Sequence, residues 1–456
     1  MRRAARGKLA DMSAAEVNGG RASVASWLRA APRHELLPPR RRAATTSEAG
    51  AEPLDQLDLG RGGALTVAAV ESGFVVVPVA DADRSPRRAV AGDGVFAAML
   101  RTMRQAASNG AFRGEAFGGA LDDGTDDEVA IDVDQSNDSV VVGGSAVVKL
   151  FPLTSPGPQP GLELPVHLAA VGFSFLPSPL GALRWTSPLG EDVVLATAAS
   201  FLPGARDGWD WYLARLLGWL DGEADDGPAF GPAPMLGRIG AAMHVGFATA
   251  SDVIPHPVST ADASTAAAWR RAALGVADEA IALTDGDEGA RLAARADAIR
   301  AELEGLGDAA GTVVTRVHGD FHVGQVLEWR DGYAVTDFDG NPMAAPAERG
   351  APDTPARDVA AFVRSIDHLG RVASTRRSGH DERIGSWIET SRRGYLDAYR
   401  HELTERGMPD LFDERLLRPL EIAQECHEYV YAAGFLPRWR YVPDLAIQAL
   451  FPVEDR

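Results

Sequence analysis

The order of hydrophobic and polar positions divides the chain into a strand-rich first part and a helix-rich second part. Two apolar, β-branched runs within residues 54–79 flank the Glu71-Ser72-Gly73 turn, which predicts a β-hairpin. Residues 95–106 show a helical pattern, and 129–150 alternate as three strands. A short helix is predicted at 162–171, and a buried strand at 193–202.

Beyond residue 204, long Ala- and Leu-rich stretches with helical periodicity dominate the pattern. They predict helices at 209–220, 233–250, 263–283, 289–306, 357–369, 384–403 and 416–434. One strand-like segment, 313–336, interrupts them. Strands that precede helices, instead of alternating with them, indicate an α+β fold.

The composition narrows the functional classes. The chain has 456 residues and a formal net charge of −19, so we do not expect a nucleic-acid or anionic-membrane binder. No apolar run reaches about 18 residues, the length of a membrane span. Cys426 is the only cysteine, which excludes an intrachain disulfide and is consistent with the cytoplasm. We expect residues 1–51 to be poorly ordered in part.

Lysine is scarce. Of the 45 basic residues only Lys8 and Lys149 are lysines, so arginine is the default cation of this chain. Lys149 lies inside the apolar run VVKLF, where an internal lysine calls for a reason. The alternative is a surface lysine whose stem covers apolar neighbours.

The strand-like segment carries the clearest chemistry. It contains His318-Gly319-Asp320-Phe321-His322, with Gln325 five residues past Asp320, and then Asp337-Phe338-Asp339-Gly340. Phosphoryl transfer requires a carboxylate that orients and deprotonates a hydroxyl, and hard oxygen ligands for Mg²⁺. Gln325 and Asp337 have such oxygens.

These motifs resemble the aminoglycoside-phosphotransferase-like kinases, which share the protein-kinase fold. The resemblance implies a bilobal kinase-like α+β fold that uses ATP and Mg²⁺. It implies that Asp320 is the catalytic base and that Gln325 and Asp337 hold Mg²⁺. It also implies that Asp358, in an Arg-Asp-Val-Ala element, supports the catalytic loop.

A kinase of this kind needs a phosphate loop and a strand lysine in its N-lobe. Ser136, Asn137 and Ser139 fit the loop, and Lys149 fits the residue that contacts the phosphates. For the lysine's ion-pair partner, Glu163 is the better candidate and Glu191 the weaker one.

The order of elements places the hinge after strand 193–202. The backbone there, at Ala199 and Phe201, would then bind adenine. Asp207 follows and either meets the ribose or is a solvated loop residue. We expect three parts: a flexible N-terminus with a cap subdomain (1–115), the N-lobe (116–202) and the helical C-lobe (203–456).

Within this family the motifs between residues 134 and 368 resemble the actinobacterial branch of maltokinases and glucosamine kinases. In that branch a cap subdomain precedes the N-lobe. The run QECHEYVYA resembles the segment of its glucosamine kinases that contacts the amino sugar. The sequence DFDGNP differs from the DFEGEP towards which maltokinases tend.

Charge spacing on the same segment also bears on the acceptor. Glu421, Glu425 and Glu428 fall on one helical face, where like charges repel unless a cation or solvent offsets them. A protonated amino group would be such a cation, although a solvated acidic face is the alternative. Trp439 either offers an aromatic face to a sugar or simply packs. Together with these residues, we expect Asp320, His322 and Gln424 at the acceptor site.

We therefore expect an ATP-dependent kinase that phosphorylates the 6-hydroxyl of glucosamine, is monomeric and contacts no nucleic acid or membrane. The alternatives are a maltokinase that makes maltose 1-phosphate, an aminoglycoside-type phosphotransferase, and a pseudokinase that only binds its ligands.

Overall fold

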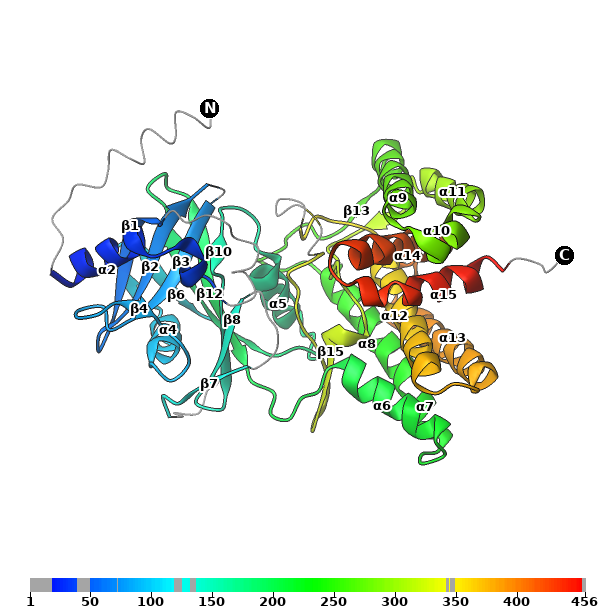
Figure 1. The fold of residues 1–456 in the computed structure, drawn as a ribbon, viewed down its shortest axis with the longest axis horizontal. Helices are drawn as coiled ribbons and strands as arrows, with labels where there is room; N and C mark the ends of the chain where they lie inside the picture. The colour runs from blue at the N-terminus through cyan, green and yellow to red at the C-terminus, as the bar shows by residue number, and fades with distance from the viewer. Residues whose placement is uncertain are drawn as a thin grey trace. The chain divides into compact units, whose positions relative to one another are not determined.

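The computed structural model describes residues 19–38, 50–71, 73–118, 125–131, 137–341, 344 and 349–452. The chain forms two compact units, drawn in Figure 1. Unit 1 comprises Met1–Leu162 with Pro177–Pro203, and unit 2 comprises Glu163–Leu176 with Gly204–Arg456. The structure thus groups the expected cap and N-lobe into one unit and assigns residues 163–176 to the other. The three-part division stays a prediction.

One antiparallel sheet of unit 1 is built from the expected hairpin. Its described strands run in the order β1 (Glu52–Gly60), β2 (Gly63–Val70), β3 (Gly73–Ala80) and β10 (Leu153–Thr154), and β4 (Arg87–Arg88) also pairs with β3. Because successive strand side chains point to opposite faces, β3 buries both of its faces. Val75, Val77 and Val79 share a core with helix α2 (Gly19–Ala30) and the segment η1 (Arg33–Leu36), whereas Phe74 and Val76 belong to the core around helix α4 (Val95–Arg104).

The second sheet of unit 1 contains the candidate nucleotide residues. Its described strands follow the order β5 (Ser108–Asn109), β6 (Phe112–Ala116), β11 (Pro179–Thr186), β12 (Asp192–Ser200), β9 (Ala146–Leu150), β8 (Asp138–Val142) and β7 (Glu128–Ala130). Leu183, Val193 and Val148 of this sheet share one core with Phe96 and Met99 of α4. Helix α4 therefore joins the two sheets into one body.

Unit 2 is mainly helical (Figure 1). Its helices are α5 (Pro160–Ala170, which enters the unit at Glu163), α6 (Gly208–Leu220), α7 (Asp226–Phe230), α8 (Pro232–Phe247), α9 (Ala263–Leu283), α10 (Gly286–Ala293), α11 (Ala296–Glu304), α12 (Pro355–Arg376), α13 (Asp381–Glu405), α14 (Leu417–Gly434) and α15 (Tyr441–Leu450). The helix expected at 289–306 is in fact part of two, α10 and α11, which meet at Ala294 and Arg295.

Two small two-stranded sheets lie among the helices of unit 2. In the first, β13 (Ser259–Thr260) pairs with β14 (Val313–Val314), and in the second, β15 (Val326–Trp329) pairs with β16 (Gly332–Val335). The segment that links β14 to β15 contains the HGDFH motif. Within the described residues no helix has the length and apolar character to cross a bilayer. The α+β fold is confirmed.

Candidate active site

The backbone of the candidate catalytic loop, residues 318–325, is held by one buried carboxylate, Asp358 in the first turn of α12. It accepts the backbone N–H groups of His318 at 2.7 Å and Gly319 at 2.9 Å. His244 Nε2, from α8, lies 3.1 Å from the same carboxylate. Burial alone would raise the pKa of Asp358, but the His244 hydrogen bond and the nearby charges outweigh it and lower the pKa. An ionised carboxylate therefore anchors the loop.

Asp320 follows directly on this anchored backbone. Burial is the main cause that raises the pKa of its carboxyl to about 7. The negative charges of Asp337, Glu428 and Asp358 add to the increase, and His318 opposes it. A carboxylate whose pKa lies near neutrality is well suited to accept a proton from a hydroxyl group.

Gln325 and Asp337 come together through the backbone. Gln325 ends the short helix η3 (Val323–Gln325), and its carbonyl accepts the N–H of Thr336 at 2.9 Å. Asp337 comes next, is exposed, and has a left-handed backbone with φ of 62°. This sparsely populated conformation carries a cost for a residue with a Cβ. Two hard oxygen donors are thereby placed at neighbouring positions.

This donor set fits Mg²⁺. Among the described residues there is no group of three or more His, Cys, Asp or Glu side chains arranged to hold a metal ion. Mg²⁺ does not require such a cage, because it is typically bound by one or two protein oxygens together with substrate phosphates and water. The side-chain oxygens of Gln325 and Asp337 fit the protein's share of such a site.

His322 presents a neutral imidazole at the same loop. Its Nδ1 accepts the N–H of Gly324 at 3.0 Å, so the proton of the neutral ring is on Nε2. Burial lowers the pKa of His322 to about 4. The ring lies 6.4 Å from that of Trp209, which in turn lies 5.6 Å from Trp439. The Nε2–H of His322 thus lies beside the Trp209 ring and 3.4 Å from the side-chain amide of Gln325.

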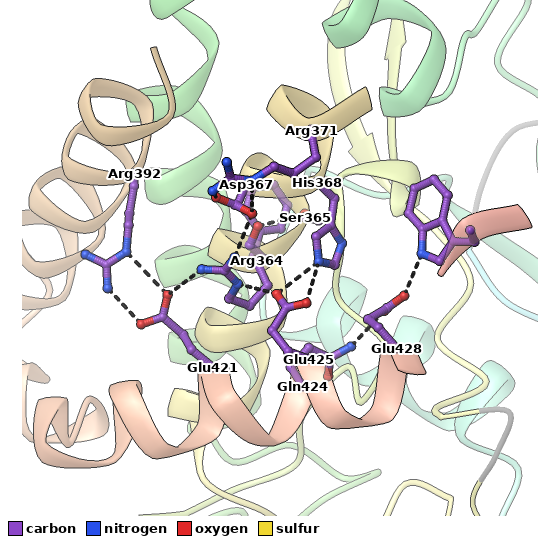
Figure 2. A network of polar contacts seen from close by, with 12 residues as sticks. Arg364, Ser365, Asp367, His368, Arg371, Arg392, Glu421, Gln424, Glu425 and Glu428 are labelled. Atoms are coloured by element: carbon purple, nitrogen blue, oxygen red, sulfur yellow. Dashed lines mark hydrogen bonds and ion pairs between the residues drawn. The ribbon is translucent and has the colours of Figure 1, made fainter. Parts of the chain in front are cut away.

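Helix α14 carries the expected acidic face, but two of its three glutamates are internal (Figure 2). Glu421 and Glu425 are 2% and 0% exposed. Arg392 binds Glu421 at 2.8 Å, and Arg364 ion-pairs with Glu425. His368 Nε2 lies 3.0 Å from Glu425 Oε1. The structure therefore corrects the expectation of three open carboxylates: the cations that offset two of them come from the protein itself.

Glu428 is the glutamate of this face that stays partly exposed. Its Oε2 accepts the indole N–H of Trp439 at 3.0 Å, and its Oε1 accepts the side-chain N–H of Gln424 at 3.2 Å. Its negative charge contributes to the raised pKa of Asp320. Trp439 therefore does more than pack, because it orients a carboxylate that acts on the candidate base.

Sequence reasoning missed the residues that surround this face. Arg364 and His368 lie one turn apart on α12, Arg392 lies on α13, and Trp209 lies in the first turn of α6. One feature of the sequence could have indicated these buried polar residues. The run Arg364-Ser365-Ile366-Asp367-His368 places four polar residues on a helix whose other positions are mostly buried, and buried polar side chains need partners.

In unit 1 the strand pairing brings together two of the nucleotide candidates. Ser139 of β8 and Lys149 of β9 are cross-strand partners in the ladder. Asn137 precedes β8, whereas Ser136 lies outside the described residues. The Lys149 ammonium lies 5.7 Å from the centre of the Phe151 ring. The pairing supports a common role for Ser139 and Lys149.

The expected hinge residues are less open than the sequence indicates. Ala199 is paired with Val147 across β12 and β9. The N–H of Phe201 donates to the carbonyl of Ser145 at 2.8 Å, because the chain continues the pairing of β12 with β9 by one more hydrogen bond there. Phe201 can therefore offer adenine its carbonyl but not its N–H.

Asp207 and Glu163 belong to unit 2. Asp207 caps α6, because its Oδ1 accepts the N–H of Asp210 at 3.1 Å. Glu163 lies in the first turn of α5. The role of Asp207 at the ribose and the pairing of Glu163 with Lys149 stay predictions.

Known proteins of one activity match almost the whole chain. A glucosamine kinase of Streptacidiphilus jiangxiensis is 40% identical over 431 residues, which cover 91% of this chain and 95% of that protein. A glucosamine kinase of Mycolicibacterium smegmatis is 35% identical over 400 residues, which cover 87% of this chain and 98% of that protein. No family model matches.

Solved structures agree with these relatives. A crystal structure of glucosamine kinase superposes with a TM-score of 0.82 at 36% identity, covering 94% of this chain and 99% of that chain. A glucosamine kinase in complex with glucosamine, ADP and inorganic phosphate gives a TM-score of 0.79 at 36% identity, with the same coverage. With such identity over nearly its full length, the chain belongs to the glucosamine kinase family.

Proposed function

We propose that this protein is an ATP-dependent kinase that transfers the γ-phosphoryl group of ATP to the 6-hydroxyl of D-glucosamine. The observation that carries the proposal is the anchored loop that bears Asp320, together with Glu428, a carboxylate held by Trp439 and Gln424. A candidate base with a pKa near 7 lies within the electrostatic influence of a partly exposed carboxylate that the protein holds in place. The similarity to proteins named glucosamine kinase supports the same activity.

In the proposed reaction Asp320 orients the 6-hydroxyl and accepts its proton as the oxygen attacks the γ-phosphorus. The anchored backbone at His318 and Gly319 holds the carboxylate, so catalysis is mostly positioning. His322, with its proton on Nε2, donates a hydrogen bond to a sugar hydroxyl. Lys149, with Asn137 and Ser139, binds the phosphates of ATP.

Mg²⁺ would be held by the side-chain oxygens of Gln325 and Asp337. When bound, it neutralises phosphate charge. Asp337 is exposed and lies two residues past the end of β16, so it can approach a phosphate-bound ion.

The acceptor's amino group is the feature that Glu428 would recognise. Glu421 and Glu425 are compensated by Arg392 and Arg364, so they are not available to a ligand cation. Within the part of the chain that the structure describes, Glu428 accepts hydrogen bonds from the neutral donors Trp439 and Gln424, and an ammonium group would balance its charge. Maltose has no such group.

A coupled ADP-release assay across glucosamine, glucose, maltose and an aminoglycoside tests the proposal. We expect glucosamine to give the highest kcat/KM. A preference for maltose would identify a maltokinase, and a preference for the aminoglycoside an antibiotic-modifying enzyme. ATP binding without ADP release on any acceptor would indicate a pseudokinase. The presence of Lys149, Asp320, Gln325 and Asp337 argues against that last outcome.

We further propose that the enzyme acts in the cytoplasm as a monomer. The single cysteine, Cys426, is buried and unpaired, as suits a reducing compartment. Light scattering behind size-exclusion chromatography tests the monomer, for which we expect a mass near the 48.3 kDa of the chain.

A further inference from the structure

The buried histidine His368 lies between the internal ion pairs of α14 and the carboxylate proposed to bind the amino group. It is 3% exposed. Its Nε2 lies 3.0 Å and 3.2 Å from the two oxygens of Glu425. An ionised carboxylate only accepts hydrogen bonds, so Nε2 carries a proton. The ring packs edge to face against Trp439 at 6.1 Å, and Trp439 holds Glu428.

We propose that His368 determines specificity for an amino sugar by setting the charge of the acceptor site. The inference rests on the proposed function. With His368 neutral, the charge of Glu428 is free to attract a substrate ammonium group. With His368 protonated, the imidazolium balances that charge through space and repels the ammonium group. A neutral sugar would not sense the difference.

The charged groups around His368 come from several elements. On α12 itself are Arg364 and Asp367, on α14 are Glu425 and Glu428, and the catalytic loop contributes His322, which is neutral. Arg364 already pairs with Glu425 and contacts Asp367 at 2.7 Å. A protonated His368 would interact with both Glu425, its hydrogen-bond partner, and Glu428. Of these two carboxylates, Glu425 already pairs with Arg364, so among the described residues Glu428 is the one whose charge the imidazolium would change most.

The direction of the titration follows from these neighbours. Burial lowers the pKa of His368, but the carboxylates of Glu425 and Glu428 outweigh it and raise the pKa above its ordinary value. Protonation of His368 therefore persists to higher pH than in an ordinary histidine. We expect affinity for glucosamine to increase as the pH rises through this pKa, until the amino group of the sugar itself loses its proton.

The first test compares wild-type protein with His368→Gln, which is neutral at every pH and keeps a donor for Glu425. Between about pH 6 and about pH 8, we expect KM for glucosamine to fall roughly tenfold more in the wild type than in the variant. KM for ATP, measured alongside, should show no such difference. Parallel glucosamine profiles in the two proteins would overturn the role of His368.

The second test needs no turnover and uses the wild-type protein, so it stands even if the variant fails to fold. By linkage, a bound ammonium group must lower the pKa of His368 if protonated His368 weakens its binding. We expect saturating glucosamine to lower the NMR-measured pKa of His368. Turnover of glucosamine without this shift would refute the inference alone, whereas absence of turnover would refute the proposed function.

Discussion

Replacement of Glu428 by Gln tests the proposed recognition of the amino group. The substitution keeps the shape of the side chain and an acceptor for the Trp439 N–H, 3.0 Å away, but removes the charge. Two unit charges 4 Å apart interact by about 4 kcal/mol at an effective dielectric constant of 20. Glu428 is partly exposed, so we take about half of that value, about 2 kcal/mol. KM for glucosamine should therefore rise roughly thirtyfold.

The same variant has a second, independent readout. The charge of Glu428 is one of the causes, after burial, that raise the pKa of Asp320 to about 7. Removing it must lower that pKa, so the acidic limb of the kcat/KM profile should move to lower pH. The control is Glu389→Gln on α13, whose side chain is 77% exposed and pairs only loosely with Arg393.

Steady-state kinetics with glucosamine and glucose, measured from acidic to alkaline pH, provide the comparison. The reasoning requires that KM for glucosamine rises far more than KM for glucose. An equal loss on both sugars would show that Glu428 shapes the site without recognising the amino group. An unchanged KM for glucosamine would refute the assignment outright.

Three further substitutions test other parts of the account. Asp320→Asn should abolish ADP release. It should also stabilise the Mg²⁺-free protein above pH 7 by about 2 kcal/mol in urea unfolding, because the raised pKa of Asp320 makes its ionised form costly in the folded state. A stability of the variant below that of the wild type above pH 7 would contradict this. Arg364→Met should cost about 3–5 kcal/mol, since it leaves the fully buried Glu425 without its arginine; a loss below about 1 kcal/mol would contradict the ion-pair network. Gly324→Ala should lower kcat with little change in KM for ATP. The reason is that the new Cβ would lie 2.7 Å from the ring of Trp209 and displace the catalytic loop. A variant with the kcat of the wild type would show that the loop tolerates the shift.

Sequence reasoning was most effective where the functional residues are neighbours in the chain. Asp320, Gln325 and Asp337 lie on two short segments, and the hairpin of β15 and β16 between them fixes their spacing. Local patterns also predicted the longer helices, and α9 matches the expected 263–283. In these places the local chemistry and the local structure carry the same information.

The features that the sequence did not predict depend on contacts between segments that are distant in the chain. The spacing of Glu421 and Glu425 indicated a charged face but not its partners, because Arg364 and His368 come from a helix about 60 positions upstream. The hydrogen bond that occupies the Phe201 N–H likewise depends on Ser145, which lies in the turn just before the paired strand β9. Burial and compensation of charge are properties of the packed structure, and periodicity alone does not reveal them.

The position of the phosphoryl group on the product tests the central claim most directly. Two-dimensional ³¹P–¹H correlation NMR of a reaction with ATP, Mg²⁺ and glucosamine reports which carbon bears the new phosphate. The account predicts a correlation to the protons on carbon 6 and ADP in equal amount. Phosphate on another position of the sugar, or no phosphorylated glucosamine while maltose is consumed, would contradict it.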